Sequence, residues 1–265
     1  MTAPSVRALS SFVLPLGLLT GLLAGPAQAQ TQKLDVPYVP TPQPVVAHML
    51  EMADVGPDDY VIDLGSGDGR IAIAAVKDRG AKAAYGIDLN PERVREATQN
   101  AEAAGVADKV TFEQGDLFKK DIADADVLTM YLLSTVNMRL RPVILDTLKP
   151  GTRVVSHAFN MEDWEPDATA VVGGSLVYLW VVPAKVTGKW TIEADGQTYQ
   201  VELSQNFQQV TGSVDGQPER LSGRLEGSEL YFTLNDQLYV GRVEGDRIQA
   251  VSAEGAVSAW IARRG

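Results

Sequence analysis

Residues 60–70 read YVIDLGSGDGR and join a strand pattern to a helix pattern through a glycine-rich turn. The apolar run at 60–64 predicts a short buried strand, and residues 71–77 have the pattern of a helix. The glycines between them leave the backbone bare, so a ligand can approach it closely at the carboxyl edge of a parallel sheet. The run therefore predicts an α/β fold with a ligand-binding site at the turn.

Strand and helix patterns alternate along the chain on both sides of this turn. Further strands are predicted at 83–88, 110–112, 127–131 and 152–157, and further helices at 45–53, 91–104 and 134–148. Asn90 is expected to cap the helix that starts with Pro91. Because five strands alternate with helices, we expect a doubly wound, Rossmann-like parallel sheet covered on both faces. Residues 169–172 and 176–182 are expected to close it as a hairpin.

The sequence changes character after Pro183 and Ala184. From there to the C-terminus helical periodicity is absent, and about eight short alternating runs are separated by turns such as Asp-Gly and Glu-Gly. We therefore predict three segments. Residues 1–29 form a signal peptide, 30–184 form the α/β domain with the ligand site, and 185–265 form a small all-β barrel or meander domain of unknown role.

The side chains around the turn indicate a positively charged ligand. A dinucleotide-binding turn needs glycine at its sixth position, where this chain has Arg70. Asp63 stands where such turns tend to have an apolar residue. A carboxylate there suits a pyrophosphate less well than S-adenosylmethionine, whose amino acid part carries an ammonium and a sulfonium group. The alternative is a glycine-rich connection without a ligand.

Two further acidic residues follow the next predicted strands. Asp88 ends the strand at 83–88, where a carboxylate accepts hydrogen bonds from both hydroxyls of a ribose. Its other interpretation is a helix cap, for which Asn90 is better placed. Asp116 follows the third strand, and we expect it to accept a hydrogen bond from the adenine amino group while Leu117 packs on the ring. A surface turn is the alternative.

Three parts of the sequence together resemble the cofactor motifs of class I, seven-strand S-adenosylmethionine-dependent methyltransferases. They are residues 63–69, 86–88 and 115–117, and the resemblance extends over residues 35–183. It implies methyl transfer as the activity and S-adenosylmethionine as the cofactor. The cofactor-binding residues that we predict are Tyr38, Thr41, Asp63, Gly65, Ser66, Gly67, Asp88, Leu89, Asp116 and Leu117.

The proline-rich segment before the turn resembles a narrower group. Residues 37–42 read PYVPTP and are similar to the segment before the glycine turn in the mitochondrial lysine methyltransferases of ATP synthase c-subunit and adenine nucleotide translocase. In that group the N-terminal segment folds over the cofactor. The resemblance implies that Tyr38 and Thr41 line the methionine side of the site. In the other interpretation, residues 30–44 are an extended linker after the signal peptide.

The end of the fourth predicted strand bears on the methyl acceptor. Residues 130–134 read MYLLS, whereas enzymes that methylate planar amino groups of adenine, cytosine or glutamine usually have Asn/Asp-Pro-Pro-aromatic there. A lysine side chain of a protein is therefore the expected acceptor. An aromatic face stabilises the positive charge that develops on an amine, so we predict Tyr131 and Tyr38 as catalytic residues. Tyr131 equally fits the core at a strand end.

The charge and composition of the chain argue against several kinds of partner and site. The formal net charge is −11 and basic residues are scattered among acidic ones, so we expect no nucleic acid partner. The chain has no cysteine, which excludes disulfides. His48 and His157 are expected to be structural and no metal is expected, although a substrate contact stays open for His157. Two other functions stay open: methylation of a small molecule with the β-rich domain as a lid, and a non-catalytic S-adenosylmethionine-binding envelope protein whose β-rich domain binds a partner.

The N-terminus has the features of a secretory signal peptide. Arg7 is its only charge, residues 12–25 are apolar, and Ala27-Gln28-Ala29 fits the small-x-small cleavage pattern. This apolar run is shorter than the roughly 20 residues that a membrane span needs. We expect export to the periplasm or cell envelope, with no membrane span after cleavage. A cytoplasmic or mitochondrial location is the alternative.

Cleavage at this pattern predicts a mature chain that begins at Gln30. In a Gram-negative host, N-terminal sequencing and intact-mass measurement of the periplasmic fraction are expected to find this form. Ala29→Arg is the matched control, because a large charged residue at the cleavage position blocks processing. Recovery of the unchanged full-length chain from the cytosol alone would contradict the expectation.

Overall fold

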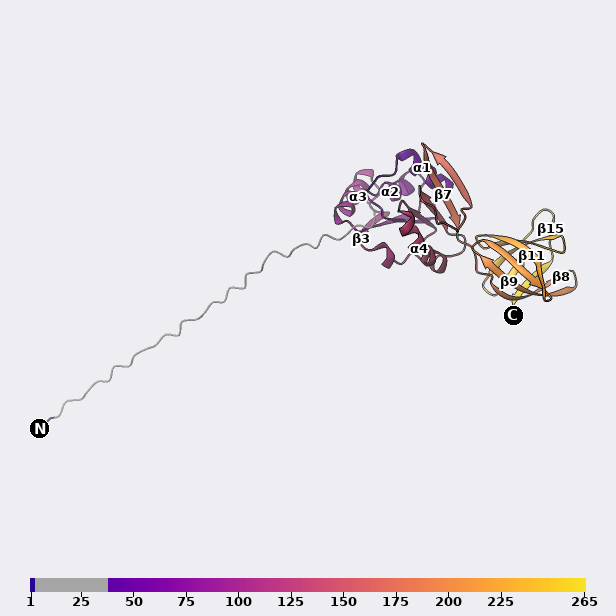
Figure 1. Ribbon diagram of the computed structural model, residues 1–265. Helices are drawn as coiled ribbons and strands as arrows, with labels where there is room; N and C mark the ends of the chain where they lie inside the picture. Colours follow the sequence, from indigo (N-terminus) through magenta and orange to yellow (C-terminus); the bar gives the residue numbers. More distant parts are fainter. Residues whose placement is uncertain (3–37) are drawn as a thin grey trace. The chain divides into compact units, whose positions relative to one another are not determined.

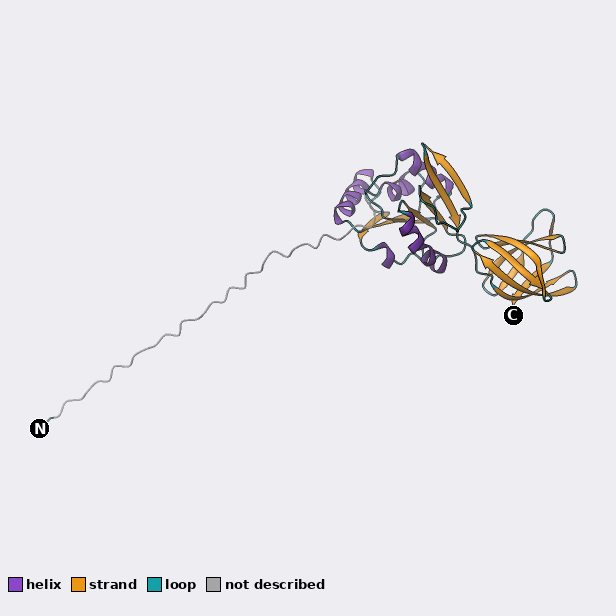
Figure 2. Cartoon of the chain, viewed as in Figure 1, coloured by secondary structure: helices purple, strands orange, loops and turns teal. Residues whose placement is uncertain are grey.

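The structure, a computed structural model, describes residues 1–2 and 38–265. The predicted cleavage site at residues 27–29 lies outside the described residues, as does nearly all of the predicted signal peptide. The described chain forms two β-sheets, of seven and nine strands, and four α-helices (Figure 2).

The seven-stranded sheet has the order β3-β2-β1-β4-β5-β7-β6. Figure 1 labels β3 and β7 of this sheet. Strands β1 to β5 are parallel, whereas β7 pairs antiparallel with both β5 and β6. The strands are β1 (Tyr60–Leu64), β2 (Ala83–Asp88), β3 (Val110–Gln114), β4 (Val127–Met130), β5 (Arg153–His157), β6 (Ala168–Val172) and β7 (Ser175–Val181). The five predicted parallel strands and the closing hairpin are thus confirmed. The strand order reverses between β1 and β4, which is where open α/β sheets bind ligands.

The helices connect these strands and begin close to where the sequence predicts. They are α1 (Gln43–Met52), α2 (Arg70–Lys77), α3 (Pro91–Ala104) and α4 (Ser134–Thr147), with a short 3-10 helix η1 (Leu117–Lys119). Asn90 caps α3 as predicted, because its side-chain oxygen accepts a hydrogen bond from the Glu92 N–H. Gly105 ends the same helix with a left-handed φ of 74°.

Both faces of the parallel sheet are buried because successive apolar residues point to opposite sides. Val61, Ala84 and Val127 belong to the core that α1, α2 and α3 cover. Their neighbours in sequence, for example Ile62 and Leu128, belong to a second core that includes α4. The near-continuous apolar runs of β1 and β4 follow from this two-sided burial.

The C-terminal part of the chain forms a closed barrel of eight antiparallel strands. Each strand pairs with the next along the chain, and β16 pairs with β8 to complete the ring. The strands are β8 (Gly188–Ala194), β9 (Gln197–Asn206), β10 (Gln209–Val214), β11 (Gln217–Glu226), β12 (Glu229–Leu234), β13 (Gln237–Glu244), β14 (Arg247–Ala250) and β16 (Trp260–Arg264), while β15 (Ala256–Val257) adds in parallel to β13. The predicted all-β region is confirmed, as a barrel rather than an open meander.

Aromatic side chains fill the barrel interior. The rings of Phe232 and Tyr239 stack with centroids 4.9 Å apart, and Trp260 meets Phe232 edge-on at 5.2 Å. Trp190 is buried in the same core, and its indole N–H donates to the Val186 carbonyl at 2.7 Å. Side chains therefore pack the interior of this small barrel.

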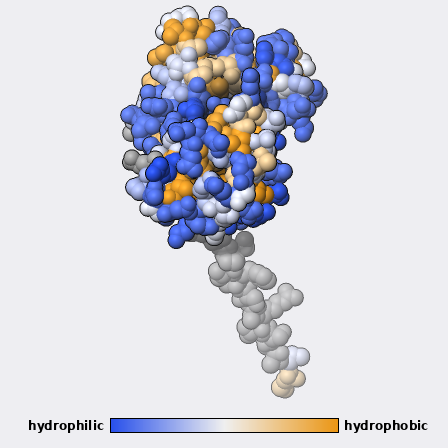
Figure 3. Space-filling model, turned by 90° about the vertical axis from the view of Figure 1, so that its right-hand side faces the viewer, coloured by the Kyte–Doolittle hydropathy of each residue, from blue (hydrophilic) through white to orange (hydrophobic). Residues whose placement is uncertain are grey.

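The surface exposes few large apolar side chains. In the view of Figure 3 hydrophilic residues predominate and hydrophobic ones form small groups. The exposed large apolar residues among those described are Met1, Tyr38, Val39, Val143, Val171, Leu176 and Leu238. None of the helices within the described ranges is long and apolar enough to cross a bilayer.

Gly223 lies where β11 and β12 approach too closely for a side chain. A Cβ atom there would lie 2.4 Å from the carbonyl oxygen of Tyr231, which is backbone and cannot rotate away. We expect Gly223→Ala to lower the free energy of unfolding by about 1–3 kcal/mol, measured by urea unfolding followed by circular dichroism. Gly56→Ala is the matched control, because nothing lies within 4 Å of a Cβ there. Equal stability of the two variants would contradict the close approach.

Candidate functional site

The glycine-rich turn between β1 and α2 is held in place by β2. The N–H groups of Gly65 and Ser66 both donate to the carbonyl of Ile87, at 2.9 and 3.0 Å. Gly67 has a φ of 53°, and a Cβ atom there would lie 2.6 Å from the ring of Tyr38. Only glycine fits this position, because it combines a left-handed φ with a close approach.

A cavity of about 920 Å³, including space open to solvent, lies over this turn. All ten residues predicted to bind the cofactor line it, and so do both predicted catalytic residues, Tyr38 and Tyr131. The lining residues that the sequence did not predict are Val39, Pro40, Asp68, Arg70, Ile71, Asn90, Arg93, Gly115 and Leu132. The cavity therefore brings the separate predicted motifs together at the carboxyl ends of β1, β2, β3 and β4.

Asp63 is buried in the wall of this cavity. Its carboxylate accepts a hydrogen bond from the Thr129 hydroxyl at 2.6 Å. Burial raises the pKa of Asp63 to about 7; the hydrogen bond from Thr129 opposes this rise, and the negative charges of Asp88 and Asp68 add to it. A cation bound beside this carboxyl would favour its ionised form.

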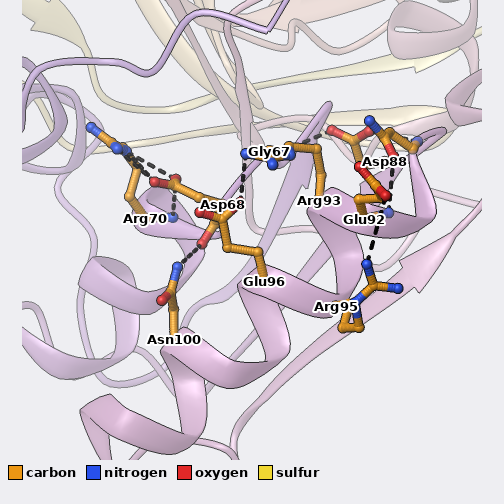
Figure 4. A network of polar contacts seen from close by, with 10 residues as sticks. Gly67, Asp68, Arg70, Asp88, Glu92, Arg93, Arg95, Glu96 and Asn100 are labelled. Carbon is orange, nitrogen blue, oxygen red and sulfur yellow. Dashed lines mark hydrogen bonds and ion pairs between the residues drawn. The ribbon is translucent and has the colours of Figure 1, made fainter.

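Asp88, at the end of β2, has both carboxylate oxygens on backbone donors at the cavity. One accepts from the Gly67 N–H at 2.9 Å, and Figure 4 labels both of these residues. The other accepts from the Asn90 N–H at 2.8 Å. Each oxygen retains a further lone pair. Asn90 supplies the cap of α3, so the alternative role of Asp88 as that cap is wrong.

Asp116 has a structural task beside its place in the cavity wall. One of its oxygens accepts from the Phe118 N–H at 3.0 Å and so caps η1. The other lies 3.7 Å from the Lys119 ammonium. Leu117 is half-buried next to it and also lines the cavity. The surface turn weighed against an adenine contact is thus present, and the adenine contact stays a prediction.

Residues 38–41 form a wall of the cavity. The guanidinium carbon of Arg93 lies 4.6 Å from the centroid of the Tyr38 ring. The Thr41 carbonyl accepts a hydrogen bond from Arg70 Nη1 at 2.8 Å, and the Thr41 hydroxyl lies 3.1 Å from His157 Nδ1. The described part of the proline-rich segment is therefore fixed against the sheet and is not a free linker.

Arg70 excludes a dinucleotide-binding turn in the sequence, and in the structure it also makes contacts that no sequence pattern marks. Arg70 Nη2 lies 2.5 Å from an Asp68 oxygen in an ion pair, which Figure 4 shows beside the turn. Burial alone would raise the pKa of Asp68, but the hydrogen bonds and charge of Arg70 outweigh it and hold that pKa below its usual range. Residues two apart do not face each other on a helix, so this pair depends on the turn before α2.

Tyr131 lines the cavity and directly follows β4 in the chain. Its ring centroid lies 3.9 Å from that of His157 and 6.1 Å from that of Phe159. His157 is buried at the end of β5, and burial lowers the pKa of its imidazole, which is therefore neutral at neutral pH. Tyr131 is half-buried and lines the cavity, and its catalytic role stays a prediction.

Two buried polar groups beside the turn fit S-adenosylmethionine. The Ser66 hydroxyl oxygen is buried and has no hydrogen-bond partner among the described residues. Asp63 has a single side-chain donor, Thr129, among those residues. A ligand with an ammonium and a carboxylate on one carbon offers a counter-ion to Asp63 and an acceptor to Ser66. The residues present therefore fit this cofactor.

Comparison with known proteins points to one family. A family model described as "ANTKMT methyltransferase domain" matches residues 63–168. The chain is 50% identical over 151 residues to the protein-lysine N-methyltransferase of Saccharolobus islandicus (strain REY15A), which covers 56% of this chain and 94% of that protein. It is 34% identical over 156 residues to the adenine nucleotide translocase lysine N-methyltransferase of Mus musculus, which covers 59% of this chain and 66% of that protein.

A solved structure gives the same fold with a related ligand. It is described as an RNA methyltransferase from Salinibacter ruber in complex with S-adenosyl-L-homocysteine. The TM-score is 0.55 at 53% sequence identity, and the match covers 56% of this chain and 96% of that one. That protein is named for a nucleic acid, whereas both relatives above are named for lysine methylation.

The raised pKa of Asp63 predicts opposite effects of one substitution on stability and binding. The pKa is about 7 in the folded chain against an ordinary 3.8, so stability falls as the pH rises from about 4 to about 7. Without cofactor, Asp63→Asn is therefore expected to have a higher free energy of unfolding than the native chain. The difference grows as the pH rises through this range and reaches at most about 4 kcal/mol at pH 8. The same variant is expected to bind S-adenosylmethionine more weakly at pH 8, because the counter-ion is lost.

Urea unfolding at pH 4.5 and pH 8 measures the first effect, and calorimetric titration measures the second. Asp124→Asn is the matched control, because the Asp124 side chain is 89% exposed and its ion pair lies on the surface. A stability difference that does not change with pH would show that Asp63 keeps an ordinary pKa.

Proposed function

We propose that this chain, which belongs to the ANTKMT-type family of S-adenosylmethionine-dependent methyltransferases, methylates a lysine side chain of a protein. The proposal rests on one observation: a single cavity is lined both by Asp63, a buried carboxyl without a counter-ion, and by the aromatic ring of Tyr131. The carboxyl suits the cationic cofactor, and the aromatic wall suits an amine that becomes positive as it reacts. The names of the relatives point to the same acceptor.

Five of the predicted residues contact the cofactor through their side chains in this proposal. Asp63 and Ser66 hold the ammonium and carboxylate of the cofactor, and the free lone pairs of Asp88 accept from its ribose hydroxyls. Asp116 and Leu117 contact the adenine. Bound S-adenosylmethionine supplies a methyl group activated by its sulfonium.

The chain's own part in methyl transfer is to orient the acceptor and exclude water. A lysine amine must arrive without its proton and in line with the methyl–sulfur bond. The rings of Tyr131 and Tyr38 line the cavity and offer faces to the ammonium that forms. Residues 38–41 shield the reacting groups from solvent, which strengthens these interactions.

RNA is the second candidate acceptor, because one similar structure is described as an RNA methyltransferase. The charges of this chain favour a protein. Two cationic side chains that line the cavity, Arg70 and Arg93, form ion pairs with Asp68 and Glu96. A net charge of −11 repels phosphates in addition.

We further propose that the N-terminal segment exports the chain. The charge, apolar run and cleavage pattern of residues 1–29 support this location. S-adenosylmethionine is made in the cytoplasm, so an exported enzyme needs a supply of it outside. A chain that is not processed and stays in the cytoplasm removes this requirement.

Transfer of labelled methyl groups tests the proposed function. With tritium-labelled S-adenosylmethionine and an extract of the source cells, we expect label that resists nuclease, is lost with protease and is recovered as methyl-lysine after acid hydrolysis. Asp88→Ala is expected to lower transfer at low cofactor concentration by roughly 100-fold, because two charged hydrogen bonds to the ribose are lost. Asp124→Ala, on the exposed surface, is the matched control.

The other outcomes separate the alternatives. Label that nuclease removes would replace the protein acceptor with RNA. Label only in small molecules would replace it with a metabolite, and the barrel would then be tested as a lid. Cofactor binding without any transfer would leave a non-catalytic binding protein.

A further inference from the structure

His157 does not line the cavity itself, but it contacts two residues that do. Its Nδ1 atom lies 3.1 Å from the hydroxyl of Thr41, in the segment before α1. Its ring lies against the ring of Tyr131 after β4, with centroids 3.9 Å apart and planes tilted by 36°. Thr41 and Tyr131 line the cavity, whereas His157 does not. One buried imidazole therefore contacts both the cofactor-side wall and the acceptor-side wall.

The backbone beside His157 is held in a strained turn. The Phe159 N–H donates to the His157 carbonyl at 2.8 Å, and Ala158 between them has a left-handed φ of 65°. A three-residue turn with positive φ at a residue other than glycine is rare and strained. It persists because the Ser156 hydroxyl donates to the Phe159 carbonyl at 2.7 Å and the Ala158 N–H donates to the Leu176 carbonyl at 2.7 Å.

The effect of this turn is to bring two rings to one side chain. His157 and Phe159 are two apart in sequence, and both rings lie beside Tyr131. The Asn137 amide also donates to the Phe159 carbonyl, at 3.1 Å, from α4. The strain is thus maintained at the place where it fixes the orientation of Tyr131.

We infer that His157 is a positioning residue for methyl transfer. Its Nδ1 holds Thr41 and with it the wall that covers the cofactor, and its ring face holds Tyr131 against the acceptor. The acceptor half of this inference rests on the proposed methyltransferase function. The cofactor half depends only on binding.

Two substitutions separate the two contacts of the ring. His157→Asn places an amide near the position of Nδ1, so it keeps a hydrogen bond to Thr41 whichever partner donates, but it loses the ring face. His157→Phe keeps a ring beside Tyr131 but leaves the buried Thr41 hydroxyl without its partner. We expect His157→Phe to weaken S-adenosylhomocysteine binding roughly 10-fold, and His157→Asn to change it less than about 3-fold.

The transfer rate is expected to respond in the opposite order. At saturating S-adenosylmethionine, His157→Asn is expected to lower single-turnover transfer to the acceptor found above by about 10-fold or more. His157→Phe is expected to stay within about 3-fold of the native rate under the same conditions. A residue that serves only core packing would impair both measurements together in both variants.

Two measurements test the role of His157 without a methyl acceptor. In protein labelled with 3-fluorotyrosine, the fluorine signal of Tyr131 is assigned by its loss in Tyr131→Phe. It is expected to shift in His157→Asn and to stay in place in Thr41→Val. Thr41→Val is expected to lower S-adenosylhomocysteine affinity as much as His157→Phe does, with no further loss in the double variant.

These results distinguish failure of the inference from failure of the proposed function. Native affinity in His157→Phe, or an unmoved Tyr131 signal in His157→Asn, would overturn the positioning role even if methyl transfer is found. An absence of transfer by the native chain would overturn the proposed function, while the affinity and fluorine measurements would still decide on His157.

Discussion

The buried carboxyl of Asp63 is the constraint around which the site is arranged. Asp63 is the penultimate residue of an apolar strand, where a charge without a counter-ion is costly, and burial holds its pKa near 7. The hydrogen bond from Thr129 relieves this cost only in part, and the negative charges of Asp88 and Asp68 add to it. Such a position is maintained where a cationic ligand supplies the missing charge. This constraint also explains the glycine-rich turn, because a ligand that reaches Asp63 must pass close to the backbone of residues 65–67.

The walls of the cavity come from segments that are far apart in sequence. The parallel order of β1, β4 and β5 places Asp63, Tyr131 and His157 at the same edge of the sheet. Helix α1 packs against β5, so the residues that precede it reach this edge as well. The fold thus explains why a short proline-rich segment before the first helix forms part of the site.

The sequence predicts well those features that depend on neighbours along the chain. The limits of β1 and β2, the cap at Asn90 and the glycine turn are all visible in local patterns. The contacts of Arg70 with Thr41 and of His157 with Thr41 join residues 29 and 116 positions apart, and no local pattern marks them. The closure of the barrel is similar, because alternation predicts strands but does not specify that β16 pairs with β8.

That closure has a consequence for how such a unit joins a larger chain. Arg264 at the end of β16 pairs with Trp190 near the start of β8, and the Gly265 N–H donates to the Lys189 carbonyl at 2.9 Å. The polypeptide therefore enters and leaves the barrel at one point. A ring without open edge strands offers no template for aggregation. Such a domain tolerates attachment to the end of an unrelated domain. It also tolerates new termini at a surface hairpin, because neither change breaks the hydrogen bonds between neighbouring strands of the barrel.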